Sequence, residues 1–228
     1  MKKIIAMVMF LCLVLALASC GAEATDAPAG MKLASNPEVV DYTAYVPTQW
    51  VITSSTGMTM AQAATTDTTN MIITHHSHSN TVEYRDTKNT LIAYLYGADE
   101  VKVSTDGSDT TDAAYREYDE TLLTKKGSYL NRLYELFDTV KDEEGNEVST
   151  FEMIEKPAFT TLNKGEKAVV AKTFTYKGTL DGATVQQKMI LSYDNAYYYN
   201  ITFTTAPGLW DTHKTTFNTI LENFSFDA

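Results

Sequence analysis

Three β-rich runs near the end of the chain place the strongest constraint on its fold. They are KAVVAKTFTYKG (residues 167–178), ATVQQKMILSYD (183–194) and AYYYNITFTT (196–205). Only short segments separate them, and these segments are rich in the residues that turns prefer, TLDG in the first case and DN in the second. Strands joined by tight turns pair antiparallel with their neighbours, so this region predicts an antiparallel meander.

The segment after the meander predicts a helix that packs on the sheet. Pro207 opens it, as proline does at the first position of many helices. Six mostly apolar residues recur at helical spacing, which places them on one face: Trp210, His213, Phe217, Ile220, Leu221 and Phe224.

Earlier parts of the chain add strands and two helical patterns. Four runs alternate with turn-forming residues and predict strands: DYTAYVP (41–47), WVITS (50–54), GMTMAQAAT (57–65) and NMIITHHS (70–77). The run TLIAYLY (90–96) fits either a strand or a helical turn. Two sets of residues at helical spacing follow: Tyr115, Tyr118 and Leu122, then Leu130, Leu133, Tyr134, Phe137 and Val140, the second capped by Ser128. These elements predict an α+β fold in which helices pack on an antiparallel sheet.

The first twenty residues predict export and a lipid anchor. A positive start, MKK, precedes an apolar run at 4–18, the pattern of a secretory signal peptide spanning residues 1–19. Its end, LASC at 17–20, resembles a bacterial lipobox, in which the cysteine is lipidated and becomes the first residue of the mature chain. Cys20 is therefore the expected lipidation site. The alternative is an ordinary signal peptide followed by a chance cysteine.

The segment after Cys20 is rich in alanine, glycine and small polar residues, which predicts a flexible tether at 20–37 and one folded domain at 38–228. Cys12 leaves with the signal peptide and Cys20 carries the lipid, so cysteine catalysis and thiolate metal sites are excluded. The expected location is the outer face of the bacterial cytoplasmic membrane, with the lipid as the membrane contact.

The charge of the chain excludes one class of partner. The full sequence has 29 acidic and 18 basic residues, a net charge of −11, and cleavage of the signal peptide would remove two of the lysines. A surface this acidic lacks the basic patch that binds nucleic acid phosphates. The sequence leaves three classes of partner possible: an envelope protein, a peptide or a small ligand.

Three stretches resemble one family. YVPTQW has Pro47 and Trp50 at the positions of a P-x-x-W motif, TLNKGEKAVVAKTFTY has Gly165 and Ala168 leading into a long strand, and the segment 197–226 ends in an F-x-F pair. Together they resemble the small PsbP-like lipoproteins of Gram-positive bacteria, relatives in fold of the photosystem II extrinsic protein and of DcrB. The resemblance covers residues 40–76 and 110–227. It implies a PsbP-like antiparallel sheet sandwiched by helices, with a binding or accessory role and no catalytic residues, while residues 77–110 depart from the pattern.

Motifs for catalysis or cofactor binding are missing from the sequence. It contains no G-x-S-x-G, no G-x-x-x-x-G-K-[ST] and no G-x-G-x-x-G. The prediction is a non-catalytic binding protein of the cell envelope that needs no cofactor. A metal-binding surface lipoprotein is the first alternative, and an unrecognised hydrolase is the second.

The metal alternative depends on His75, His76 and His78 in the run ITHHSHS. In a strand, His76 and His78 lie on one face and His75 on the other. Two imidazoles on one face can begin a Zn²⁺ or Cu²⁺ site, which needs a further ligand such as His213 or a carboxylate.

Two acidic loops and one tyrosine complete the candidates. DGSDTTD (106–112) and DEEGNE (142–147) do not have EF-hand spacing, so they are predicted to be solvated turns rather than Ca²⁺ sites. In the run YYY, Tyr197 and Tyr199 share a face that is predicted to be core. Tyr198 lies on the opposite face, where it is a candidate to line a ligand groove.

Overall fold

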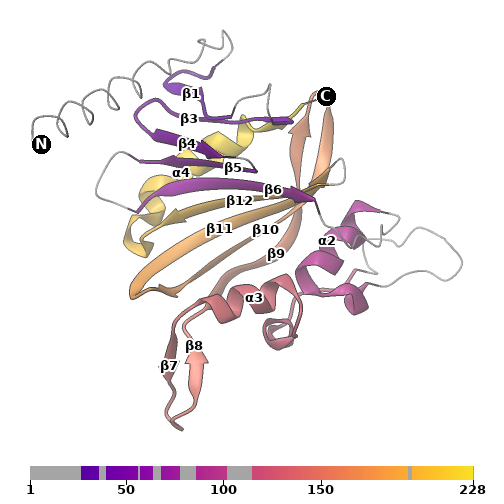
Figure 1. Ribbon diagram of the computed structural model, residues 1–228, viewed down its shortest axis with the longest axis vertical. Coiled ribbons are helices and arrows are strands. Elements are labelled where there is room, and N and C mark those ends of the chain that lie inside the picture. The colour runs from indigo at the N-terminus through magenta and orange to yellow at the C-terminus, as the bar shows by residue number, and fades with distance from the viewer. Residues whose placement is uncertain are drawn as a thin grey trace, which may run out of the picture.

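A nine-stranded sheet forms the centre of the computed structural model (Figure 1), which describes residues 27–35, 40–55, 57–63, 68–77, 86–101, 115–194 and 197–227. All neighbouring strands pair antiparallel except β13 and β9, which are parallel. In sheet order the strands are β2 (Tyr42–Thr43), β13 (Ser225–Phe226), β9 (Glu152–Lys164), β10 (Lys167–Leu180), β11 (Ala183–Asp194), β12 (Tyr197–Thr205), β6 (Asn70–Ser77), β5 (Met58–Gln62) and β4 (Val51–Ser55).

Two small sheets and three α-helices surround this sheet. β1 (Met31–Leu33) pairs with β3 (Tyr45–Pro47), and β7 (Thr139–Lys141) pairs with β8 (Glu147–Ser149) in a hairpin that projects from the domain (Figure 1). The α-helices are α2 (Thr87–Tyr96), α3 (Tyr129–Leu136) and α4 (Trp210–Glu222), and the short 3₁₀ helices are η1 (Ala98–Glu100), η3 (Glu120–Thr124) and η4 (Pro207–Leu209). In the part of the chain that the structure describes, none of these helices has the length and apolar character needed to span a membrane.

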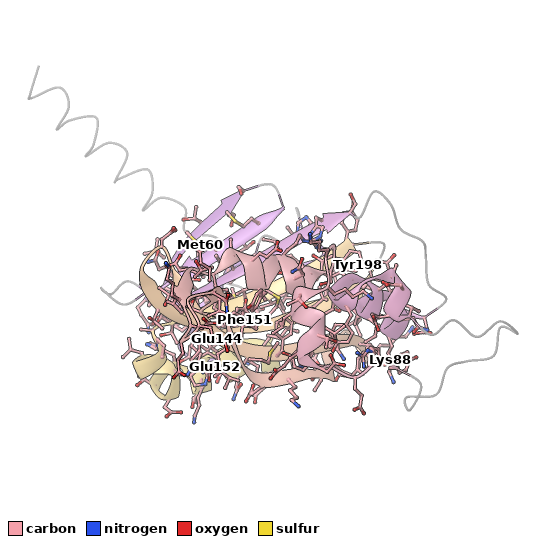
Figure 2. All side chains as sticks on the ribbon, turned by 90° about the horizontal axis from the view of Figure 1, so that it is seen from below. Met60, Lys88, Glu144, Phe151, Glu152 and Tyr198 are labelled. Carbon is pink, nitrogen blue, oxygen red and sulfur yellow. The ribbon has the colours of Figure 1, made fainter. Side chains whose placement is uncertain are left out.

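The sheet carries a separate hydrophobic core on each face. One core lies under α4 and includes Ile190, Ile201, Phe203 and Phe217. The other lies under α2 and α3 and includes residues of the same strands with the opposite orientation, such as Leu191 and Tyr198. Side chains fill the space between the sheet and its helices (Figure 2). The fold is therefore α+β, an antiparallel sheet between helices, as predicted.

Several predicted elements are confirmed. The three runs of the meander are β10, β11 and β12, and the four earlier runs contain β2 to β6. Ser128 caps α3, since its hydroxyl accepts a hydrogen bond from the backbone N–H of Asn131 at 3.0 Å. The ambiguous run at 90–96 belongs to a helix, α2, which Asp86 caps by accepting from Asn89 N–H at 2.8 Å.

Two predicted helical stretches are wrong in part. Tyr115 and Tyr118 precede η3, because Asp119 accepts a hydrogen bond from the backbone N–H of Thr121 and starts a 3₁₀ turn only there. The predicted helical stripe does not reach Val140, because α3 ends at Leu136 and Val140 is 52% exposed in the projecting hairpin.

Ordered structure begins inside the range that was expected to be a tether. Residues Met31–Leu33 of β1 pair with Tyr45–Pro47 of β3, and Ala34 is buried. Backbone pairing and burial give this segment a fixed position, so the folded part starts before residue 38. The signal peptide and Cys20 lie outside the described residues.

The longest element missed by the sequence analysis is β9. Its sequence, EMIEKPAFTTLNK, contains a proline, which argues against a strand in the interior of a sheet. The structure accommodates Pro157 at a bulge, because Ala158 pairs with Thr173 whereas Glu155 pairs with Thr175. Between these two pairs the chain advances three residues along β9 but only two along β10. The extra residue is a β-bulge, where strand pairing does not require the backbone N–H that Pro157 lacks.

Gly178 in β10 leaves room for an aromatic ring of the second core. A Cβ atom added to Gly178 would lie 2.7 Å from Cε1 of Phe137, which is 3% exposed. Phe137 follows α3 directly, so its ring helps to fix that helix against the sheet.

We expect Gly178→Ala to lower the free energy of unfolding by about 1–3 kcal/mol, the usual cost of overpacking a well-filled core. Urea denaturation measures this change. Gly208→Ala is the matched control, since no atom lies within 4 Å of its added Cβ and its backbone is not left-handed. An equal effect of both substitutions would contradict the assigned role of the Phe137 contact.

Candidate functional site

His75 and His76 lie on opposite faces of β6, as the alternation of a strand predicts. The ring of His75 lies on the α4 face, with centroid distances of 6.2 Å to Tyr42 and 6.0 Å to both Tyr197 and Tyr199. Its Nδ1 atom is buried and has no hydrogen-bond partner. The environment of His75 is therefore a group of tyrosine rings.

His76 lies on the face that α2 covers. Its ring centroid is 6.0 Å from those of Tyr94 and Tyr198, and its Nε2 atom is 3.4 Å from the hydroxyl of Tyr94. His78, its predicted companion on that face, lies outside the described residues.

The suggestion that His213 completes a metal site with His76 is wrong. His213 is on α4 and stacks on Phe217, with ring centroids 6.2 Å apart, whereas His76 lies on the opposite face of the sheet. Within the described ranges, no group of three or more histidine, cysteine, aspartate or glutamate residues is placed to hold a metal ion.

The acidic segment 142–147 forms the turn of the β7–β8 hairpin. Asp142 accepts hydrogen bonds from the backbone N–H groups of Glu144 at 3.0 Å and Asn146 at 2.8 Å. Hydrogen bonds from Asn146 lower the pKa of Asp142, because they stabilise its charged form. The bond from the backbone N–H has the largest effect, followed by the bond from the side chain. The carboxylate therefore stabilises its own turn, as expected for a solvated loop. The other acidic segment, 106–112, lies outside the described residues.

Tyr198 does not line a groove. It is 4% exposed, and its ring centroid lies 4.3 Å from Tyr94 and 4.9 Å from Tyr193. Strand alternation assigned Tyr198 to the correct face, but this face is covered by α2, whose helical state the sequence left open. The prediction that Tyr198 lines a ligand groove is therefore wrong, and Tyr198 is a core residue.

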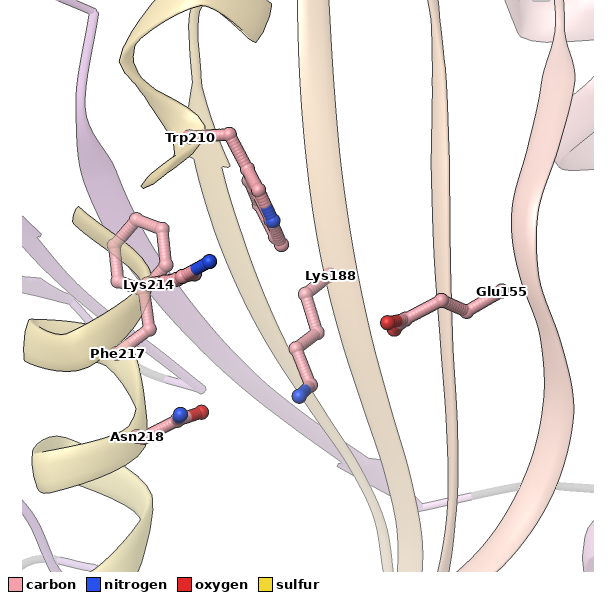
Figure 3. A pocket seen from close by; sticks show the side chains of 6 residues that line it. All are labelled: Glu155, Lys188, Trp210, Lys214, Phe217 and Asn218. Atoms are coloured by element: carbon pink, nitrogen blue, oxygen red, sulfur yellow. The ribbon is translucent and has the colours of Figure 1, made fainter. Parts of the chain in front are cut away.

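A pocket of about 130 Å³ lies between α4 and the sheet (Figure 3). Its lining combines charged and aromatic side chains: Glu155, Lys188, Trp210, Lys214, Phe217 and Asn218. The lining thus comes from β9, β11 and α4, so the pocket exists only when the helix is docked on the sheet.

The strand register explains the floor of this pocket. Thr175 of β10 is paired with Glu155 on one side and with Lys188 on the other, which puts the three residues in one row across the sheet. Thr175 is 1% exposed and its hydroxyl donates a hydrogen bond to the Glu155 carboxylate. This bond holds the carboxylate over the row, where it points towards Lys188 (Figure 3).

The two lysines of the pocket differ in their partners. Lys214 Nζ lies 2.7 Å from the Asp211 carboxylate, one turn earlier on α4. Lys188 has no ion pair with any described residue. Lys188 is not among the residues predicted for a site, although strand alternation places it on the same face as the core residue Ile190. A lysine on the core-facing side of a predicted strand is the sequence signal that could have identified Lys188 as a site residue.

Comparisons with known proteins give similarity only to solved structures. No family model matches the chain, and no curated protein matches it. The solution structure of the cyanobacterial PsbP protein CyanoP from Synechocystis aligns with a TM-score of 0.49 and 13% identity over 91% of this chain and 98% of that one. A Pseudomonas aeruginosa protein of unknown function, PA94, aligns with a TM-score of 0.39 and 12% identity over 85% of this chain and 94% of that one.

Proposed function

We propose that the chain is a lipid-anchored PsbP-like protein at the outer face of the bacterial cytoplasmic membrane, and that its domain binds a partner or ligand without catalysing a reaction. The observation that carries the anchor is the lipobox-like LASC at 17–20, directly after an apolar signal segment. Two lipid chains on Cys20 supply enough apolar surface for stable membrane attachment.

The position of the first strand supports a domain close to the membrane. β1 begins at Met31, so the covalent chain from Cys20 to the fold spans at most roughly 40 Å. Because the chain is acidic overall, an anionic membrane surface repels the domain, and attachment depends on the lipid.

The pocket supports binding rather than hydrolysis. None of its described lining residues is a serine, cysteine or histidine, so the pocket does not have the nucleophile and base of Ser–His or Cys–His hydrolases. Its charged and aromatic groups are those that orient a bound ligand.

Replacement of Cys20 tests the anchor. We expect cells that express the native chain to incorporate labelled palmitate into it, and expect Cys20→Ala to abolish the label because the acceptor thiol is gone. Cys12→Ala is the matched control, since Cys12 lies within the apolar signal segment and should leave the label intact. Label in Cys20→Ala, or none in the native chain, would refute the anchor.

A further inference from the structure

We propose that the pocket beside α4 binds a small monocarboxylate that carries an apolar group. This inference rests on the proposed binding role and adds the chemical class of the ligand. It does not depend on the lipid, because the pocket is formed entirely by β9, β11 and α4.

The polar half of the pocket favours a carboxylate. Lys188 offers an ammonium group that has no ion pair with a described residue, and Figure 3 shows its side chain extending from β11 into the space beside α4. Lys214 donates to the single carboxylate of Asp211 at 2.7 Å, which leaves donors of its ammonium group for a second acceptor. Asn218 adds an amide one turn further along the helix. Both lysines line the same pocket of an acidic protein, and this favours an anion there.

The aromatic half of the pocket favours an apolar group on the same ligand. Trp210 and Phe217 lie with ring centroids 5.8 Å apart and planes inclined by 55°. Phe217 is 1% exposed, while Trp210 is only half-buried and presents its indole ring to the pocket (Figure 3). Such rings bind flat or aliphatic groups by excluding water from them.

The remaining lining residue restricts the charge of the ligand. Glu155 is held by Thr175 and points towards Lys188, so the lining sets one fixed carboxylate against two ammonium groups and favours a ligand with a single negative charge. The pocket volume of about 130 Å³ is well below the size of most drug-binding pockets. Charge and size together select one carboxylate and one small ring or alkyl group.

Binding of cyclohexanecarboxylate to the full chain in a non-ionic detergent tests the proposal. Neither this probe nor its neutral analogue cyclohexylmethanol absorbs where tryptophan is excited, so emission reports on Trp210 directly. Trp50, the other tryptophan, is 3% exposed and belongs to the core, so its emission should not change. We expect saturable quenching or a spectral shift with the carboxylate, and binding of the alcohol that is at least about tenfold weaker.

Two variants locate the site. Lys188→Met keeps the length of the side chain but removes the charge, and it should weaken carboxylate binding about tenfold. Lys167→Met removes an exposed lysine from β10 outside the pocket and should leave the affinity unchanged. Equal affinity for the acid and the alcohol, native affinity in Lys188→Met, or no response at about 10 mM would each overturn the proposal. Palmitate labelling of Cys20 is independent of all three results, so the two proposals fail separately.

Discussion

Replacing Lys172 with methionine is expected to raise the free energy of unfolding at pH 7 by about 1–3 kcal/mol. Lys172 is 3% exposed in β10, and its ammonium lies over the rings of Phe159 at 4.0 Å and Tyr96 at 5.4 Å. In the described part of the chain no carboxylate pairs with it. Burial lowers the pKa of Lys172 from 10.5 to about 8, a difference that corresponds to roughly 3 kcal/mol. Attraction to the two rings offsets part of this cost.

The effect of this substitution should depend on pH in a defined direction. Below pH 8 both the folded and the unfolded chain carry the charge at Lys172, so the native protein bears the full cost of burying it. Between pH 8 and about 10.5 the folded state is neutral there while the unfolded state still binds the proton, so the cost falls as pH rises. The stability advantage of Lys172→Met should therefore disappear by about pH 10.5.

Urea denaturation of both proteins at pH 7, 8, 9 and 10 measures this difference. Other groups that titrate in this range, including the tyrosines, are present in both chains and cancel in the comparison. Lys167→Met, an exposed lysine of the same strand, should give no advantage at any pH. A destabilised Lys172→Met at pH 7, or an advantage that does not change with pH, would show that burial of the charge is not the dominant effect.

Truncating Phe217 to alanine is expected to lower the free energy of unfolding by about 3–5 kcal/mol, the range for a buried phenylalanine. Phe217 is 1% exposed and stacks on Phe203 of β12, with ring centroids 4.6 Å apart. It belongs to the core that joins α4 to the sheet, so the substitution leaves a cavity at the centre of that contact.

The midpoint of urea denaturation, followed by circular dichroism, measures the loss. Thr215→Ala changes an exposed residue of the same helix and should shift stability by no more than about 0.5 kcal/mol. A loss below about 1 kcal/mol for Phe217→Ala would mean that α4 contributes little to the fold.

The sequence predicts the meander and α4 because their signals are local. The runs that become β10, β11 and β12 are rich in β-branched and aromatic residues and have short turns, and the apolar face of α4 repeats at helical spacing. β9 has no such local signal, because a strand can contain Pro157 there only through a bulge that depends on pairing with β10. The state of residues 90–96 depends in the same way on a tertiary contact with β10 and β11.

The candidate site is less predictable than the fold. Alternation along a strand correctly separates His75 from His76 and Tyr197 from Tyr198. Strand alternation does not predict which helix covers each face of the sheet. The positions of the helices bury Tyr198 and place His213 and His76 on opposite faces. The pocket requires Glu155, Lys188 and Lys214 to meet, and these residues come from a missed strand, a predicted strand and a predicted helix.

The pairing of β13 with β2 has a consequence for the order of folding. Phe226 pairs with Tyr42, and the hydroxyl of Thr43 donates to Asp227 across a separation of 184 residues. Closing so long a loop is entropically costly and slow compared with forming local hairpins such as β10–β11. In the described sheet β2 pairs only with β13, so β2 has no neighbour there until β13 has docked. β2 and β13, although far apart in the sequence, therefore complete one edge of the sheet together as a late step of folding.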